Sequence, residues 1–292
     1  MTTRRRALTM IAAFAAGPAL ARRAPDTLRW TGRAFGAEVS LQLSGPRDAI
    51  RRARDRALDE LSRIEALFTL YDPHSFLRRL NDTGRATIHD HRISDLLTAT
   101  DRLWSATEGR FDPSVQSVWE ARAPDAPIAP WSDVRWTPAR IDLAPGQRLT
   151  FNGIAQGYAT DRVAACLAAE GATQTLVNIG EFRATGGPYR LAIADPDWGE
   201  ISRIGLADSA VATSSPGALR FSDGSAHIID PTHTRAPLWS SVTVEAARAT
   251  IADAASTAFC LMTRAEILAA RRQLPDIRRV WLIETSGDIS TI

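Results

Sequence analysis

Two glycines four residues apart, Gly153 and Gly157, stand where the sequence predicts a change from strand to helix. Apolar residues over 147–151 indicate a strand, and small apolar residues at helical spacing indicate a helix from the turn to Gly171. A helix that begins at a glycine-bearing turn offers free N–H groups to an anion, usually a phosphate. The spacing matches neither the dinucleotide fingerprint nor the P-loop, so a tight turn built for packing is the alternative.

Four further short stretches carry polar residue types that structure alone does not require. They are Tyr71-Asp72-Pro73-His74-Ser75, Gly109-Arg110-Phe111-Asp112-Pro113, His227-Ile228-Ile229-Asp230-Pro231 and Ala252-Asp253-Ala254-Ala255-Ser256-Thr257. Asp253 and Thr257 are four residues apart and therefore share one face of a helix. Each stretch also has an ordinary structural explanation, because Asp-Pro pairs are common in turns and a carboxylate near a helix start satisfies free N–H groups. The Thr257 hydroxyl could bond a preceding carbonyl, and His227 could be a satisfied, half-buried histidine.

The elements that must position these stretches are a mixture of strands and helices. Strands are expected within 28–43 on either side of a turn, over 174–179, 189–194, 241–245 and 280–283, over the short run 226–229, and as a neighbouring pair over 201–206 and 209–213. Helices are expected from Pro46 to about residue 70, over 75–80, 93–107, 251–262 and 264–273. Mixed elements with neighbouring hairpins favour an α+β fold over a βαβ series.

Composition and charge restrict the class of protein. The 292 residues are 45% hydrophobic and 23% charged, with a formal net charge of +2. These values are typical of a soluble globular chain that forms one large domain or two lobes. A balance so close to neutrality does not predict a nucleic-acid surface. We expect no transmembrane segment once the N-terminal leader is removed.

The first 21 residues predict an export signal. Thr3-Arg4-Arg5-Arg6 precedes an apolar run over 7–20, and Ala19-Leu20-Ala21 has the small-x-small form of a cleavage site. The arginines resemble a twin-arginine signal, although Ala7 occupies the position of the usual Phe, so the ordinary secretory route stays open. We therefore expect a mature domain over 22–292, composed of two lobes and located in the periplasm.

The order of the motifs resembles that of one family, the FAD:protein FMN transferases, or ApbE family. The matching stretches are Tyr71…Ser75…Leu80-Asn81, Gly109…Phe111-Asp112-Pro113-Ser114-Val115, Gly153-Ile154-Ala155-Gln156-Gly157-Tyr158-Ala159…Asp161, Val177-Asn178-Ile179-Gly180-Glu181, Thr213-Ser214-Ser215, His227-Ile228-Ile229-Asp230-Pro231 and Ala252-Asp253-Ala254-Ala255-Ser256-Thr257-Ala258. The resemblance covers essentially all of the expected mature chain. It implies an ApbE-like, T-fold-like α+β architecture of two lobes, with mixed or antiparallel sheets flanked by helices and a cleft for FAD.

The resemblance also implies a site. Mg²⁺ would be bound by the Asp253 carboxylate, the Thr257 hydroxyl and the Gly153 carbonyl, since oxygen ligands suit a hard cation. His227 would be the general base, because the ordinary pKa of histidine lies near neutrality. The residues implied to contact FAD are Phe35, Tyr71, Phe111, Asp112, Pro113, Gln156 and Ile229.

The implied reaction uses FAD as a substrate. A threonine hydroxyl of an exported acceptor protein would attack the FMN-side phosphorus, AMP would leave, and FMN would stay on the acceptor as a phosphoester. An FAD-binding carrier without transfer activity and an FAD pyrophosphatase that releases FMN and AMP are the alternatives.

The chain departs from the family pattern at three positions near the nucleotide. Thr150 replaces an Asp that touches FAD, Gln156 replaces a Lys, and Glu181 replaces the second glycine of the V-N-x-G-G motif. These departures predict that FAD contacts are partly rewritten while the implied metal ligands are kept.

Overall fold

The computed structural model describes residues 26–121, 128–221, 224 and 226–292. Its centre is an eight-stranded sheet in which all neighbouring strands are antiparallel. In spatial order the strands are β1 Asp26–Ala34, β2 Ala37–Gly45, β6 Gln174–Asn178, β7 Phe182–Thr185, β10 Ala210–Ser214, β11 Ser241–Ala246, β12 Ile277–Ile283 and β13 Ile289–Thr291. Antiparallel sheets flanked by helices confirm the predicted α+β class.

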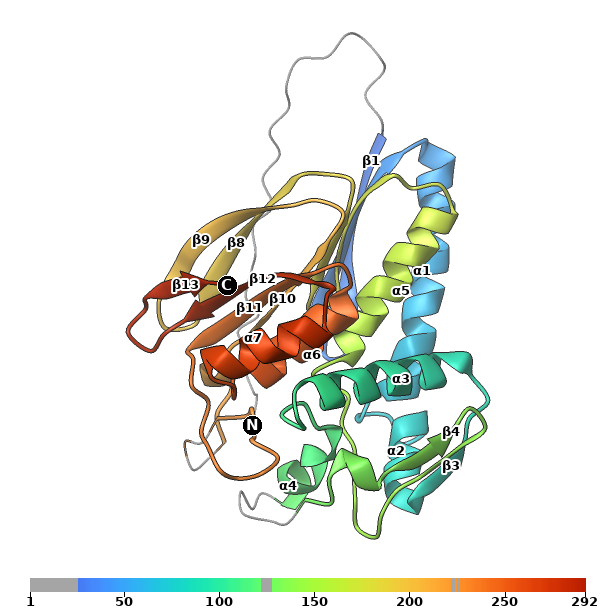
Figure 1. The fold of residues 1–292 in the computed structure, drawn as a ribbon. Coiled ribbons are helices and arrows are strands. Elements are labelled where there is room, and N and C mark those ends of the chain that lie inside the picture. The colour runs from blue at the N-terminus through green and yellow to red at the C-terminus, as the bar shows by residue number, and fades with distance from the viewer. Residues whose placement is uncertain (1–25, 122–127, 222–223, 225) are drawn as a thin grey trace.

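Helices cover one face of this sheet (Figure 1). They are α1 Arg47–Phe68, α5 Ala155–Ala169, α6 Ala249–Phe259 and α7 Arg264–Gln273. Helix α1 follows Pro46, and its buried residues Ile50, Ala53, Ala57, Leu61, Ile64 and Phe68 recur every three or four positions. This apolar stripe packs on α5 and on the inward-facing Val39, Leu41 and Leu43 of β2, which alternate along the strand.

A two-stranded hairpin forms a separate small core. Its strands are β8 Tyr189–Asp195 and β9 Gly199–Leu206. Leu191, Ile193 and Leu206 of the hairpin are buried against residues of the main sheet that include Phe182 and Trp281. The sheet is therefore buried on two sides over its middle strands.

A second group of elements lies beside the helical layer. It contains α2 Phe76–Thr83, α3 His91–Ala106, the short helices Pro113–Val115, α4 Gln116–Ala121 and Trp131–Asp133, and a three-stranded sheet of β3 Arg85–Thr87, β5 Arg140–Asp142 and β4 Arg135–Thr137. Figure 1 shows this group below α5 and α6. Ser75 begins α2 as a side-chain cap, since its hydroxyl accepts from Arg78 N, as the sequence predicts.

The predicted strand over 147–151 is wrong, because the segment is extended but joins no sheet. Its backbone is satisfied by a side chain instead. Asn81 donates from Nδ2 to the Leu149 carbonyl at 2.8 Å and accepts the Leu149 N–H on Oδ1 at 2.8 Å. The Thr150 N–H donates to the Pro113 carbonyl at 2.9 Å. A buried amide side chain thus imitates a neighbouring strand, which apolar periodicity cannot reveal.

Two further strand predictions are wrong, one in its pairing and the other in its secondary structure. The strands predicted over 201–206 and 209–213 exist as β9 and β10, but β9 pairs with β8 and β10 pairs with β7 and β11. The run 226–229 is not a strand; Ala226 makes one isolated bridge to Arg220, and bends follow. Sheet partners are set by non-local packing, so an apolar run alone does not identify them.

Two other findings concern the chain as a whole. No helix among the described residues combines the length and apolarity needed to span a membrane. The predicted export signal over 1–21 lies outside the residues that the structure describes.

Candidate functional site

Helices α5 and α6 meet at Gly157 and Asp253. The Gly157 N–H donates to Asp253 Oδ2 at 2.8 Å. A Cβ atom at position 157 would lie 2.4 Å from the carbonyl oxygen of Ala249 and 2.7 Å from Asp253 Cβ. Because no side chain fits in that space, glycine is required where the two helices approach so closely.

The turn before α5 lies beside the same face of α6. A Cβ atom at Gly153 would lie 3.1 Å from Thr257 Oγ1 and 3.5 Å from the ring of Phe111. The Thr257 hydroxyl is 3.2 Å from the Asp253 carbonyl oxygen, to which it donates, and 3.2 Å from Ser214 Oγ. The structure therefore brings together the three residues that the family resemblance implies as metal ligands.

The backbone of this turn leaves one carbonyl available. In a regular helix the N–H of residue 157 donates to the carbonyl of residue 153. Here the Gly157 N–H donates to Asp253 instead, and no N–H in the described part of the chain donates to the Gly153 carbonyl. The arrangement thus offers a carboxylate, a hydroxyl and a carbonyl oxygen on neighbouring segments.

This set of donors fits a hard divalent cation such as Mg²⁺. All three are oxygens, and Mg²⁺ completes its shell with water and substrate phosphate. Among the described residues, no group of three or more His, Cys, Asp and Glu side chains could hold a metal ion. The ligand set that the family resemblance implies, with the Gly153 carbonyl and outer ligands, stays a prediction.

Two acidic side chains at this contact have raised pKa values. Burial raises the pKa of Asp253 to about 7, although the Gly157 N–H opposes the shift. Burial and the nearby Asp253 carboxylate raise the pKa of Glu181 as well. No ion pair joins either carboxylate to Arg or His in the residues with described positions. In the absence of a basic partner, burial favours the protonated forms, and a bound cation would instead stabilise the ionised ones.

The start of α5 offers fewer free N–H groups than the glycine-bearing turn suggests. The Ala155 N–H donates to the Phe151 carbonyl at 2.7 Å, and the Gly157 N–H is taken by Asp253. The Gln156 N–H has no acceptor among the described residues. A phosphate would therefore find at most one amide of this first turn unoccupied.

The 110–113 stretch lies against the turn. Phe111 is buried beside Gly153, and the Pro113 carbonyl accepts the Thr150 N–H. The Asp112 carboxylate is buried and accepts the N–H groups of Ser114 and Trp131, each at 2.8 Å. Burial raises its pKa. Asp112 thus organises this loop, which explains its residue type without a ligand.

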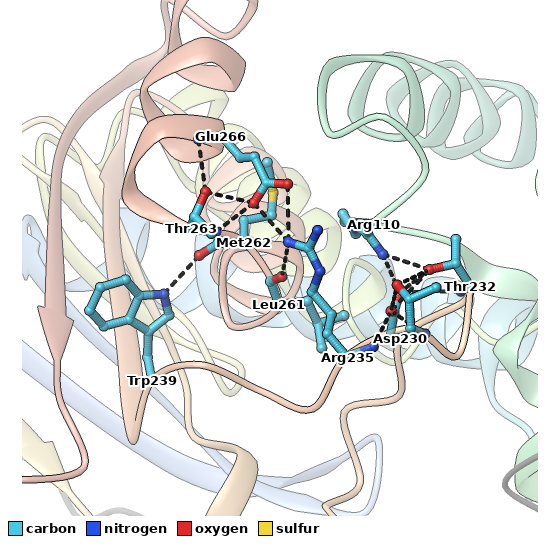
Figure 2. A network of polar contacts seen from close by, with 10 residues as sticks. Arg110, Asp230, Thr232, Arg235, Trp239, Leu261, Met262, Thr263 and Glu266 are labelled. Carbon is cyan, nitrogen blue, oxygen red and sulfur yellow. Dashed lines mark hydrogen bonds and ion pairs between the residues drawn. The ribbon is translucent and has the colours of Figure 1, made fainter.

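Asp230 organises the loop that follows His227 (Figure 2). Its carboxylate accepts hydrogen bonds from backbone N–H groups and hydroxyls of Thr232 and Thr234 and from the Arg235 N–H. Arg110 Nη1 lies 2.6 Å from Asp230 Oδ1. Burial alone would raise the pKa of Asp230, but these donors lower it to about 2.

The same loop reaches α7 on its other side. Figure 2 shows Arg235 extending to Glu266, with 2.9 Å between Arg235 Nη1 and Glu266 Oε2. Trp239 Nε1 donates to the Met262 carbonyl at 2.9 Å. The loop is therefore fastened both to the 110–113 stretch and to the α6–α7 corner.

His227 is half-buried and has a defined tautomer. Its Nδ1 lies 2.9 Å from the Leu219 carbonyl and 3.3 Å from the Pro216 carbonyl. A carbonyl only accepts, so Nδ1 carries the hydrogen and neutral imidazole has its lone pair on Nε2. The segment that holds His227 follows Ser214, whose hydroxyl contacts Thr257.

The remaining predicted FAD residues lie at different distances from the turn. The Gln156 side chain packs on Gly180, where a Cβ would lie 2.5 Å from Gln156 Nε2. Ile229 is partly buried next to Asp230. Phe35 and Tyr71 lie near the C-terminal end of α1: the Phe35 N–H donates to Glu65 Oε1, and Tyr71 is 70% exposed. No described contact joins these last two to Gly153, Asp253 or Thr257.

A groove of about 790 Å³ opens between α3, α5 and β7. Its wall includes Arg102, Arg162, Arg183 and Arg248, but these side chains form ion pairs with Asp276, Glu60, Asp95 and Asp161. None of the seven predicted FAD residues lines it. The groove is therefore separate from the predicted nucleotide contacts.

Sequence reasoning missed the roles of two residues at the contact. Ser214 bonds both Thr257 and Ser256, with 2.8 Å between the two serine hydroxyls. The sequence marks Glu181 only as a departure from a motif, whereas in the structure the Asp253 carboxylate is near enough to raise the pKa of Glu181. The signals in the sequence were a polar residue, Ser214, at the end of a strand and a carboxylate, Glu181, in a motif that otherwise carries glycine.

Comparisons with known proteins identify the family of this chain. The fold and the site together define a class of α+β proteins in which a glycine-bearing turn faces a helix that carries an Asp and a Thr. The family model for the ApbE family matches residues 35–281. The chain belongs to the ApbE family.

Solved structures share the fold at low sequence identity. The ApbE protein of Thermotoga maritima has a TM-score of 0.79 and 24% identity, over 91% of this chain and 96% of that one. The apo flavinyl transferase ApbE of Pseudomonas stutzeri has a TM-score of 0.76 and 22% identity, over 94% and 96%. The flavin transferase ApbE of Vibrio cholerae has a TM-score of 0.78 and 21% identity, over 92% and 97%. No curated protein matches the chain.

Proposed function

We propose that this chain is a Mg²⁺-dependent FAD:protein FMN transferase. It would move FMN from FAD to a threonine hydroxyl of an acceptor protein and release AMP. Family membership and the description of two structural neighbours as flavin transferases support the reaction class. The observation that carries the proposal is the convergence of the Gly153 turn with Asp253 and Thr257.

The three oxygen groups would hold the cation. The Asp253 carboxylate supplies the charge, while the Gly153 carbonyl and the Thr257 hydroxyl supply neutral ligands on neighbouring segments. A bound Mg²⁺ would neutralise charge that grows on the diphosphate and would hold it in line. The carboxylate is ionised when the cation binds, so binding would weaken as pH falls below about 7.

His227 would take the proton from the acceptor threonine. Its Nδ1–H is held by a backbone carbonyl, so Nε2 is the atom that accepts. The threonine oxygen forms a bond to the FMN-side phosphorus, and the bond from that phosphorus to the bridging oxygen breaks. AMP leaves with the electron pair, and the proton moves to His227.

The flavin nucleotide would lie across the loops around the turn. Tyr71 would stack on the flavin or on its adenine, as the family resemblance implies. Phe35, Gln156 and Ile229 would line its path, and Phe111 and Pro113 would form the wall behind it. Asp112 would act through the shape of its loop, since its oxygens already accept two backbone N–H groups.

We further propose that the protein works outside the cytoplasm. The support comes from the sequence alone: arginines before an apolar run and a small-x-small cleavage site within 1–21. The acceptor would then be an exported protein with an accessible threonine.

A transfer assay tests the proposed function. The protein is incubated with FAD, Mg²⁺ and a threonine-containing acceptor, and in-gel flavin fluorescence and released AMP are measured. Thr257→Val removes one ligand oxygen with little change of shape and should lower the rate at limiting Mg²⁺. Ser256→Ala is the matched control, because its hydroxyl contacts Ser214 but is not a proposed ligand.

The alternatives give different readouts in the same assay. AMP released without a fluorescent acceptor would indicate a pyrophosphatase. FAD bound without AMP or labelled acceptor would indicate a carrier. Either result, obtained with several threonine-containing acceptors, would contradict the proposed transfer.

A further inference from the structure

The N-terminus of α6 lacks a cap from its own segment. Arg248 occupies the N-cap position and makes no side-chain cap hydrogen bond, and the first turn contains no acidic residue. The first N–H groups of a helix need acceptors when they are buried, and Ala249 and Thr250 are both buried. The acceptor must come from another element.

Asp161 of α5 supplies that acceptor. Its Oδ1 accepts the Ala249 N–H at 2.9 Å, and its Oδ2 accepts the Thr250 N–H at 3.0 Å and the Thr250 hydroxyl at 2.6 Å. Arg183 Nη1 donates to Asp161 Oδ1 at 2.8 Å and to the Ala247 carbonyl at 2.7 Å. One carboxylate thus joins α5, β7 and the start of α6.

Asp161 and the proposed cation site occupy successive turns of the same helix pair. On α5, Gly157 and Asp161 are four residues apart, and on α6, Ala249 and Asp253 are four residues apart. Gly157 bonds Asp253, and Asp161 bonds Ala249. Sliding α6 by one turn, or about 5.4 Å, would break both links, so together they define the register of the two helices.

We propose that Asp161 is a positioning residue for the cation site, a role that rests on the proposed function. By holding the first turn of α6 against α5, it keeps Asp253 and Thr257 facing the Gly153 carbonyl. It does not touch the cation. Residues that hydrogen-bond a metal ligand and orient it typically contribute 10–100-fold to metal affinity. Asp161 acts one helical turn away from Asp253, so we expect an effect near the lower end of that range.

Two variants and one control test this role. In Asp161→Asn, an amide NH₂ replaces one acceptor and faces an N–H donor, so one half of the link breaks. Thr250→Val removes the hydroxyl that donates to Asp161 and keeps the backbone N–H that donates to the same carboxylate. It is the milder variant, for use if Asp161→Asn folds poorly. Asp95→Asn is the matched control. Asp95 lines the same groove as Asp161, and its carboxylate contacts Tyr158 and Arg162.

The first measurement is Mn²⁺ affinity by calorimetry. Asp161→Asn should bind about tenfold or more weakly and Thr250→Val more weakly to a lesser degree, while Asp95→Asn should bind like wild type. Wild-type affinity in Asp161→Asn would overturn the proposal.

The second measurement is amide hydrogen exchange without metal. A simple cap would protect only the amides of Ala249 and Thr250. A positioning residue also protects the Gly157 amide, so that amide should exchange faster in Asp161→Asn. Unchanged Gly157 exchange would overturn the positioning role. If wild-type protein bound no Mn²⁺, the cation part of the proposed function would fail, and Gly157 exchange would still decide the role of Asp161.

Discussion

Asp253 combines two properties that oppose each other in a metal-free protein. Its side chain is almost fully buried, and the donor that the structure places on it is the backbone N–H of Gly157. Burial therefore raises its pKa to about 7. The cation that we propose would stabilise the ionised carboxylate, so the residue type suits a metal-loaded site better than a metal-free fold.

The pH dependence of stability should show this. Because the pKa of Asp253 is higher in the folded state than its ordinary value of 3.8, the folded protein binds more protons between those values. The Asp253 contribution to the free energy of unfolding of metal-free protein should fall by roughly 2–4 kcal/mol as pH rises from about 4 to about 7. Urea unfolding in EDTA measures it.

Asp253→Asn should make the measured fall smaller, because it removes the Asp253 titration while its amide carbonyl can still accept the Gly157 N–H. Glu181 and Asp112, whose pKa values are also raised, keep their own contributions. Exposed Asp59 of α1 provides the control, and Asp59→Asn should retain the wild-type pH dependence. A fall of the same size in Asp253→Asn would show that other groups cause it.

His227 is predicted to affect the rate and not the binding of FAD. Its Nδ1 lies 2.9 Å from the Leu219 carbonyl, so the neutral ring carries its lone pair on Nε2. His227→Ala should lower transfer by roughly 10²–10⁴-fold and leave the FAD dissociation constant within about twofold. Fluorescence titration measures binding and the in-gel assay measures transfer. If His227→Ala weakened FAD binding as much as it lowered transfer, His227 would not be the general base.

At the scale of elements, the site depends on the close contact of α5 and α6. Gly157→Ala would place a Cβ within 2.4 Å of the Ala249 carbonyl oxygen, so the helices must separate. We expect a loss of about 1–3 kcal/mol of stability and weaker Mg²⁺ binding. Thermal or urea unfolding and calorimetry measure the two effects.

Gly205 of β9 provides a matched control for that substitution. A Cβ there would meet only Pro188 at 3.8 Å, an ordinary contact. Gly205→Ala should change stability by less than about 1 kcal/mol. Equal effects of the two substitutions would mean that the helix contact is not the reason for glycine at 157.

The loop after His227 depends on Asp230. Its pKa is lowered to about 2, so its stabilising contribution is complete above its ordinary value of 3.8 and is lost as pH falls towards 2. Asp230→Asn should cost about 1–3 kcal/mol at pH 7 and speed amide exchange at Thr232, Thr234 and Arg235. Exposed Asp133→Asn should do neither. Unchanged exchange in Asp230→Asn would contradict this account of the loop.

At the scale of the whole molecule, local patterns predicted most elements and few of their partners. The stripe of α1 and the Ser75 cap of α2 follow from neighbouring residues, and both are confirmed. The strand prediction over 147–151 is wrong because the backbone of Leu149 is hydrogen-bonded to the side chain of Asn81, 68 residues away, and not to another strand. The pairing of β9 with β8 likewise depends on how a hairpin covers the sheet.

The candidate site was predictable to the extent that motifs kept their order. Asp253 and Thr257 share a helix face by spacing alone, and the structure places Gly153 next to them. The hydrogen bond from Gly157 to Asp253 was not predictable, because it depends on the close approach of α5 and α6 at a residue that has no side chain. The roles of His227 and the FAD residues stay predictions.

A crystal of the protein soaked in Mn²⁺ would test the central claim most directly, since anomalous scattering locates that ion. We predict one strong peak at about 2.0–2.3 Å from the Gly153 carbonyl, the Asp253 carboxylate and the Thr257 hydroxyl. A peak on other residues, or none at these three oxygens at saturating Mn²⁺, would contradict the account.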